Sequence, residues 1–80
     1  MEEKQIYEKL ASVMGEVLGL DGLKLSAEMT ANDVEGWDSL SHIRIVLSVE
    51  ESFGIHFSTV EIPELRNVGE FVALIKSKIS

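Results

Sequence analysis

Residues 19–38, a stretch of about 20 residues, show no lasting hydrophobic period, although they lie between two amphipathic segments of an 80-residue chain. Glycine, aspartate and asparagine interrupt each pattern there. A connection of this length is unusual in so small a domain and is often functional. The plainer alternative is a packed connection between two helices that run the same way. Its large apolar residues can pin it to a core in either case: Leu20, Leu23, Leu25, Met29 and Val34.

Three other segments have the apolar spacing of amphipathic helices. The first is predicted at Glu3–Leu18, with Gly19 as its C-terminal stop. The second is predicted at Ser39–Phe53 and ends at Gly54. The last opens on a capping box formed by the asparagine and glutamate of residues 67–70 and runs to about residue 79. Its inward side chains are expected to be Val68, Phe71, Val72, Ile75 and Ile79.

A shorter element is expected between the last two helices. Ser58 and Glu61 make a capping box for one short turn, which Pro63 should end, and residues 55–57 just before it should be extended. No strand alternation survives beyond a few residues. The sequence therefore predicts an all-α fold, a small bundle of three main helices plus one short helix, with residues 1–80 as a single domain.

The charge balance narrows the classes of partner. Fourteen acidic residues against seven basic ones give a net charge of −7, without the clustered cations that nucleic acids or anionic membranes require. The absence of cysteine excludes disulfides and thiolate metal sites. No membrane-spanning run or secretory leader is visible, so we expect a cytoplasmic protein. The acidic residues either attract partners with basic surfaces or only keep the domain in solution.

The second predicted helix carries two apolar stripes. With Ser39 at zero and about 100° per residue, one stripe falls between roughly 240° and 340° and the other between roughly 40° and 100°. The first stripe is an ordinary buried face. The second is either buried as well, which makes the helix central, or it is an exposed docking patch beside Ser39. The members of the first are Ile45, Val46, Val49 and Phe53, and those of the second are Leu40, Ile43 and Leu47.

Ser39 stands where the long connection meets this helix. A helix start favours an anion, so a phosphate ester on its hydroxyl would be stabilised there. Ser39 can instead be a simple helix cap, a role that Asp38 can also fill. A catalytic serine would need a base, and the two candidates, His42 and His56, have no evident orienting partner; we expect neither histidine to have a chemical role.

Metal and phosphate motifs are not found. The acidic residues near the helix start do not fit a twelve-residue calcium loop, because Trp37 takes a ligand position and Leu40 and Ser41 stand where a glutamate should follow. The sequence also lacks a phosphate-binding glycine loop and a His-x-x-x-His pair.

The segment Gly36-Trp37-Asp38-Ser39-Leu40 resembles the Asp-Ser-Leu attachment motif of acyl carrier proteins. The resemblance covers nearly the whole chain, including its length, its acidity, the long first loop, the Glu-Glu-Ser-Phe-Gly sequence at 50–54 and the short third helix. It implies that a phosphopantetheinyl transferase attaches 4′-phosphopantetheine from coenzyme A to Ser39. The arm's thiol would then carry acyl groups as thioesters between acyl-loading and acyl-processing enzymes.

The resemblance also assigns the docking surface. Ile43 and Leu47 match apolar positions of the family's recognition helix, and Glu50 and Glu51 match its acids. Asp38 and Leu40 flank the attachment site, and Arg44 makes the surface mixed in sign. In the family the bundle interior can shelter an acyl chain. The residues that could line such a space here are Ile45, Val46, Val49, Ile62, Phe71 and Ile75.

The chain departs from the carriers of dissociated fatty-acid synthesis directly after the motif. Ser41, His42 and Arg44 replace the acids that are usual there, and Trp37 is more typical of carriers that serve polyketide, lipid-modification or other specialised pathways. Peptidyl carriers usually show a different glycine-rich motif. The sequence predicts a monomeric, non-catalytic carrier; the alternative is a small helical adaptor that binds a protein partner without a prosthetic group.

Overall fold

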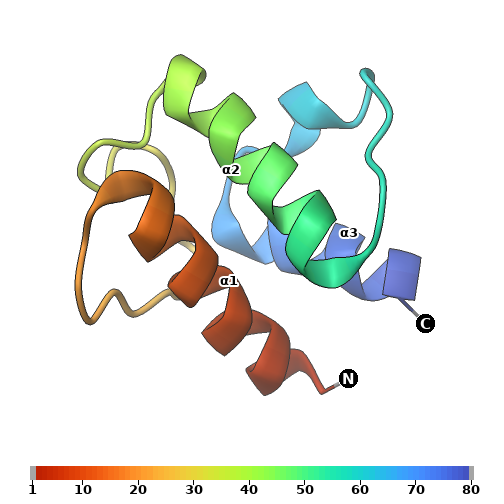
Figure 1. The fold of residues 1–80 in the computed structure, drawn as a ribbon, viewed down its shortest axis with the longest axis horizontal. Coiled ribbons are helices and arrows are strands. Elements are labelled where there is room, and N and C mark those ends of the chain that lie inside the picture. The colour runs from red at the N-terminus through yellow and green to blue at the C-terminus, as the bar shows by residue number, and fades with distance from the viewer. Residues whose placement is uncertain (1, 80) are drawn as a thin grey trace.

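The computed structural model describes residues 2–79 and is all-helical within that range (Figure 1). The helices are α1 (Glu3–Leu18), α2 (Ser39–Phe53) and α3 (Val68–Ile79), with a single 3-10 turn, η1 (Ile62–Glu64), between the last two. The only strand-like feature of the described residues is an isolated bridge between Thr30, in the loop after α1, and Asn67, just before α3. The predicted bounds of the three main helices are confirmed, because each helix ends where its apolar period ends. None of these helices is both long and apolar enough to cross a bilayer.

The first two helices run in opposite directions (Figure 1). The plainer alternative for residues 19–38, a packed connection between helices running the same way, is therefore wrong about the direction of the helices. The connection descends from the end of α1 to the start of α3 and then climbs back to the start of α2 (Figure 1). It needs its length to make this detour.

Backbone hydrogen bonds hold residues 27–29 of this loop against the start of α3. The Val68 and Gly69 amides donate to the carbonyl oxygens of Met29 and Ala27, at 2.9 and 3.0 Å. A Cβ atom at Gly69 would lie 3.1 Å from the Ala27 oxygen, a tight contact, so the close approach of the loop favours glycine there. The start of α3 is thus the platform on which the loop turns back.

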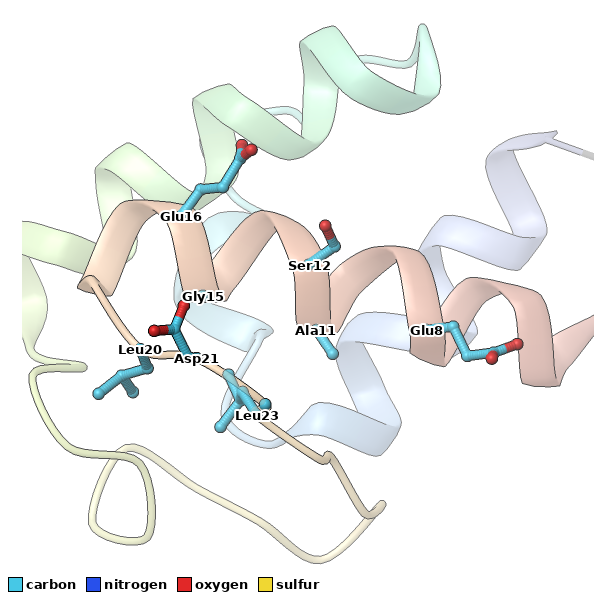
Figure 2. Close-up of a pocket in the computed structure, with 9 residues that line it drawn as sticks. Glu8, Ala11, Ser12, Gly15, Glu16, Leu20, Asp21 and Leu23 are labelled. Carbon is cyan, nitrogen blue, oxygen red and sulfur yellow. The ribbon is translucent and has the colours of Figure 1, made fainter.

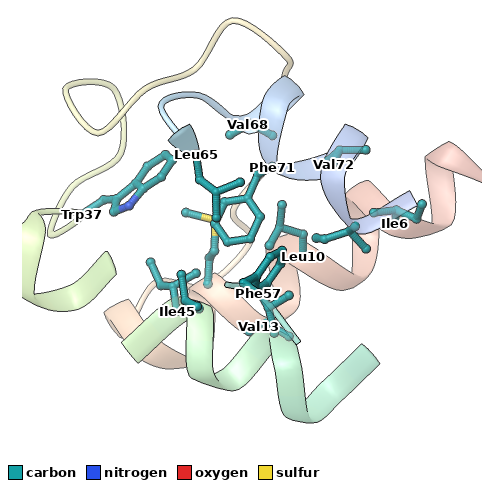
Figure 3. Packing of buried hydrophobic residues seen from close by; sticks show 14 of the residues in the cluster. Ile6, Leu10, Val13, Trp37, Ile45, Phe57, Leu65, Val68, Phe71 and Val72 are labelled. Carbon is teal, nitrogen blue, oxygen red and sulfur yellow. The ribbon is translucent and has the colours of Figure 1, made fainter. Parts of the chain in front are cut away.

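One apolar core joins the three helices and both connections. Figure 3 shows side chains from all of them around Phe71, whose ring meets the Phe57 ring edge to face at 6.0 Å. The loop residues expected to pin residues 19–38 do so, since Val34 is buried and the other four pack against the core. The buried residues are Ile6, Leu10, Val13, Met14, Val34, Trp37, Ile45, Val46, Val49, Ile55, Phe57, Leu65, Val68, Phe71, Val72 and Ile75.

The short fourth helix is not confirmed. In its place stands the 3-10 turn η1, which is three residues long. Pro63 was expected to end the element, but it lies within the first positions of the turn, where its missing N–H costs nothing. Glu61 anchors the preceding turn by accepting from the Ser58 amide at 2.7 Å and pairing with Lys78 of α3 at 3.0 Å.

Candidate functional site

The start of α2 is built on a tight turn that ends the long loop. Gly36 has a φ of +84°, a conformation that other residues rarely adopt. The Ser41 hydroxyl donates to the Gly36 carbonyl oxygen at 2.7 Å and accepts from the Asp38 amide at 2.8 Å. The turn and the first helical turn are therefore tied together by one side chain.

Asp38 is the N-cap of α2. Its Oδ1 accepts from the amides of Leu40 and Ser41, at 3.0 and 2.9 Å. The hydrogen bond from the Ser41 amide is the main cause of a lowered Asp38 pKa, with a further contribution from Leu40. Asp38 thus places a negative charge at the helix start and caps the helix itself, so Ser39 is not needed as the cap.

Ser39 is the first residue of α2 and is exposed. Within residues 2–79, no hydrogen bond to its hydroxyl is formed, so the cap interpretation of Ser39 does not hold. A nucleophilic serine would need a base in contact with it. The histidine one turn along is engaged elsewhere, which removes the geometric basis for serine catalysis.

His42 joins three parts of the molecule. Its Nδ1 accepts from the indole Nε1–H of buried Trp37 at 3.0 Å. Since an indole N–H can only donate, the other ring nitrogen carries the proton and donates to the Ile62 carbonyl oxygen at 3.3 Å. The His42 ring also stacks on Trp37 and meets Phe71 edge to face, each at 6.0 Å between centroids.

This structural role of His42 was missed at the level of sequence. The signal for it was present, because His42 falls at about 300° on the helical wheel, in the middle of the buried stripe of α2. A polar side chain on an apolar face needs a buried partner, and the adjacent tryptophan supplies it. His56, by contrast, is exposed and only approaches Glu50, at 3.8 Å.

The second apolar stripe of α2 is exposed. Leu40, Ile43 and Leu47 are 72%, 46% and 59% exposed, whereas Ile45, Val46 and Val49 are buried. Of the two interpretations of this stripe, burial is therefore wrong and exposure is confirmed, while docking at the stripe stays a prediction. Phe53, expected on the buried stripe, is only partly buried, beneath the Lys9 ammonium group at 4.8 Å. One further large apolar side chain, Val60, is 73% exposed, and the sequence analysis did not single it out.

The charged residues of α2 divide in the same way. Arg44 and Glu51 are exposed, and neither forms an ion pair within the described residues. Glu50 is largely covered, with its side chain 18% exposed, and its carboxylate accepts from the Phe57 amide at 2.8 Å. Glu50 therefore fixes the segment after α2, and a docking role for it stays a prediction.

A groove of about 520 Å³ opens beside Ser39. Its walls come from residues 30–32 of the loop, the start of α2 and the η1 region. Of the six residues expected to shelter an acyl chain, Ile62 lines this groove, and the other five are packed in the core. An interior acyl space stays a prediction.

A second hollow, of about 450 Å³, lies between α1 and the start of the loop that follows it (Figure 2). Glu8 and Glu16 come from α1, and Asp21 and Leu23 from the loop that follows it (Figure 2). It shares no lining residue with the groove at Ser39 and is not connected with that hydroxyl. Among the described residues no three metal-ligating side chains gather at either place.

Residues 8–75 match the family described as "phosphopantetheine attachment site". The chain belongs to the acyl carrier protein family. An acyl carrier protein of Guillardia theta is 31% identical over 100% of this chain and 99% of its own length. An acyl carrier protein of Thermotoga maritima is 29% identical over 95% of this chain and 94% of its own.

A solved structure agrees with the sequence relatives. The solution NMR structure of holo acyl carrier protein from Geobacter metallireducens matches with a TM-score of 0.85 and 34% identity, over 92% of this chain and 85% of that one. The family match and this holo structure together show that the cofactor of the present chain is covalently attached 4′-phosphopantetheine. The start of α2 fits such a group, because it offers an exposed serine whose hydroxyl bonds to no other described residue, beside an open groove.

Proposed function

We propose that Ser39 bears the 4′-phosphopantetheine arm and that the domain is a non-catalytic carrier of acyl groups. The observation that carries this is the division of roles at the start of α2. Asp38 and Ser41 do the capping, while the Ser39 hydroxyl is exposed on a fixed backbone. When bound, the arm supplies the thiol on which acyl groups travel as thioesters between a loading enzyme and processing enzymes.

The transfer itself belongs to a phosphopantetheinyl transferase. The Ser39 oxygen forms a bond to the phosphorus of coenzyme A that bears the pantetheine, and the phosphoanhydride bond breaks. The hydroxyl proton goes to a base of the transferase, and adenosine 3′,5′-bisphosphate leaves. This chain contributes the position of its oxygen, which the capped helix holds and which no other described residue engages in a hydrogen bond.

The exposed stripe of α2 is the proposed docking surface for these enzymes. Leu40, Ile43 and Leu47 supply the apolar contacts, and Arg44 and Glu51 lie exposed on the same helix. A stripe of three side chains is small, which favours weak and reversible docking. A carrier needs this, since it must leave each enzyme after one step.

The proposed pathway is a specialised one, such as polyketide synthesis or lipid modification, with fatty-acid synthesis as the alternative. Support comes from the residues that follow the attachment site, where His42 is built into the core contact with Trp37 and Arg44 is exposed. These positions present no acid. An enzyme with a strongly basic docking site would therefore find no acid in the first helical turns after Ser39, where Arg44 would oppose it.

We further propose that residues 1–80 act as one carrier domain, monomeric and cytoplasmic, that binds neither nucleic acid nor membranes. The single core shared by all three helices supports one domain, and the net charge of −7 argues against polyanionic partners.

The test is incubation with coenzyme A and a phosphopantetheinyl transferase of broad specificity, followed by intact mass. The wild type should gain the mass of one phosphopantetheine group, and Ser39→Ala should gain none. Ser52→Ala is the matched control, because Ser52 is an exposed serine of the same helix, and it should be modified like the wild type. A wild-type chain left unmodified by several transferases, and bare when purified from its own cells, would favour the adaptor without a prosthetic group.

A further inference from the structure

The groove beside Ser39 has an uneven distribution of charge. Besides Ser39 and Asp38, its lining includes a single arginine, Arg66. The Arg66 side chain makes no ion pair within residues 2–79. Its backbone amide donates to Glu70 at 3.3 Å, which fixes the backbone of Arg66 at the edge of α3 and leaves the guanidinium available.

A phosphodiester on the Ser39 oxygen would meet a repulsive neighbour on one side. Asp38 is adjacent, and its pKa is lowered by the Ser41 amide, so its carboxylate is charged at neutral pH. The two amides that it caps, those of Leu40 and Ser41, are no longer available to the phosphate. The side chain of the groove's lining that can offset this negative charge is Arg66.

The rest of the groove suits the carbon chain next to that phosphate. In pantetheine a dimethyl-substituted carbon stands close to the phosphate, and hydroxyl and amide groups follow. Ile43, Ile62 and Pro63 give the groove an apolar wall, and Thr30 and Asn32 give it a polar one. His42 also lines it, but both of its ring nitrogens are engaged.

We propose that Arg66 binds the phosphodiester of the arm and holds the arm's first segment in the groove between residues 30–32, the start of α2 and η1. The proposal rests on the proposed attachment at Ser39. Arginine suits this task because its planar fork offers paired N–H groups to phosphate oxygens. The carrier would then have two states, one with the arm lying in the groove and one with the arm extended toward an enzyme.

Arg44 provides a matched control. It is exposed and, like Arg66, forms no ion pair with any described residue, but it stands on α2 outside the groove. Replacing either with glutamine removes one positive charge from the domain. Only the replacement in the groove should affect the arm.

The experiment compares apo and holo forms of the wild type, Arg66→Gln and Arg44→Gln, with intact mass showing one phosphopantetheine group on each holo sample. Backbone amide shifts between apo and holo report where the arm lies, and the ³¹P shift reports on the phosphate. In the wild type and Arg44→Gln, the changes should reach residues 62–66 across the groove. In Arg66→Gln they should shrink toward Ser39, with a roughly two- to fivefold loss of the docked state, as expected for an exposed ion pair.

High salt offers a test that needs no variant. Raising the ionic strength of the wild-type holo protein should weaken the same amide and ³¹P shifts, since the pair lies at the surface. Identical shifts in the wild type and Arg66→Gln, or shifts insensitive to salt, would overturn the role of Arg66. A wild type that takes up no phosphopantetheine would overturn the attachment at Ser39 itself.

Discussion

Helix α2 carries two apolar stripes that differ in what covers them. Ile45, Val46 and Val49 are at most 2% exposed, because α1, α3 and the loops pack on that side. Leu40, Ile43 and Leu47 are 46–72% exposed. The two stripes are alike in composition, so composition does not decide which becomes core. The arrangement of the other helices decides it, and the stripe that they leave uncovered is the proposed docking surface.

The polar residues of α2 follow the same division. On the inner side, His42 links Trp37 to Ile62, and Glu50 binds the amide of Phe57. On the outer side, Arg44 is exposed and unpaired within the described residues. The polar groups of the inner face are used by the fold, while Arg44 on the outer face is exposed at the proposed docking surface.

The largest expected difference between the stripes comes from adding a charge. Val46→Glu would bury an unpaired carboxylate in the core and should cost more than about 4 kcal/mol, enough to unfold a domain of this size. Ile43→Glu and Leu47→Glu should change the free energy of unfolding by less than about 1 kcal/mol, while weakening partner binding. Circular dichroism and urea unfolding measure the stability of each variant.

Partner binding is measured in the same set through the rate of modification by the transferase. If all three charged variants unfold alike, the outer stripe belongs to the core and the docking surface does not exist. If Ile43→Glu and Leu47→Glu fold and are modified at the wild-type rate, the transferase docks elsewhere.

The sequence was enough to locate both stripes and the ends of all three main helices, because apolar period, glycine stops and caps are local signals. It did not show that α1 and α2 run in opposite directions. That direction depends on backbone hydrogen bonds between residues 27–29 and α3, and no side-chain pattern announces them. The 3-10 form of η1 was missed for a similar reason, since a capping box does not distinguish one 3-10 turn from a short α-helix.

The site was predictable in part. The Asp-Ser-Leu motif singled out Ser39, and the structure gives that residue an exposed hydroxyl. The bond between Trp37 and His42 was not foreseen, because it joins a loop residue to a helix residue and depends on the turn at Gly36. The engagement of Glu50 by a backbone amide is equally invisible in the sequence.

His42 gives the next largest effect on the inner face. His42→Ala would leave the buried indole N–H of Trp37 without an acceptor and remove the contact with Phe71, which should cost about 2–3 kcal/mol. Trp37→Phe removes the same hydrogen bond from its other end. Urea unfolding followed by circular dichroism gives the free energies, and the double variant should lose clearly less than the sum of the two. Additive losses would mean that the pair makes no joint contribution.

The adjacent acids Glu50 and Glu51 compare the two faces at smaller scale. Glu50→Ala removes the acceptor of the Phe57 amide and should lower the free energy of unfolding by about 1 kcal/mol. Glu51→Ala, at an exposed position, should stay within about 0.5 kcal/mol of the wild type. Equal stability of the two variants would show that the hydrogen bond of Glu50 contributes nothing to the free energy of unfolding. The rate at which the transferase modifies each variant shows which of the two acids contributes to docking.

The smallest effect concerns Asp38, where both faces of α2 begin. Its folded-state pKa lies below the ordinary value of 3.8, chiefly because the Ser41 amide donates to it, so its contribution to stability is present above that value. The contribution is lost as the pH falls through the lower, folded-state pKa.

Asp38→Asn keeps an oxygen acceptor for the cap but does not titrate. Urea midpoints of the wild type should therefore fall more steeply with acidification than those of Asp38→Asn. Glu61, whose pKa is lowered in the same direction, is present in both proteins, so the difference between the two curves belongs to Asp38. Parallel curves would mean that the cap does not distinguish the charged from the neutral carboxyl, and that the charge of Asp38 contributes nothing measurable to the stability of the fold.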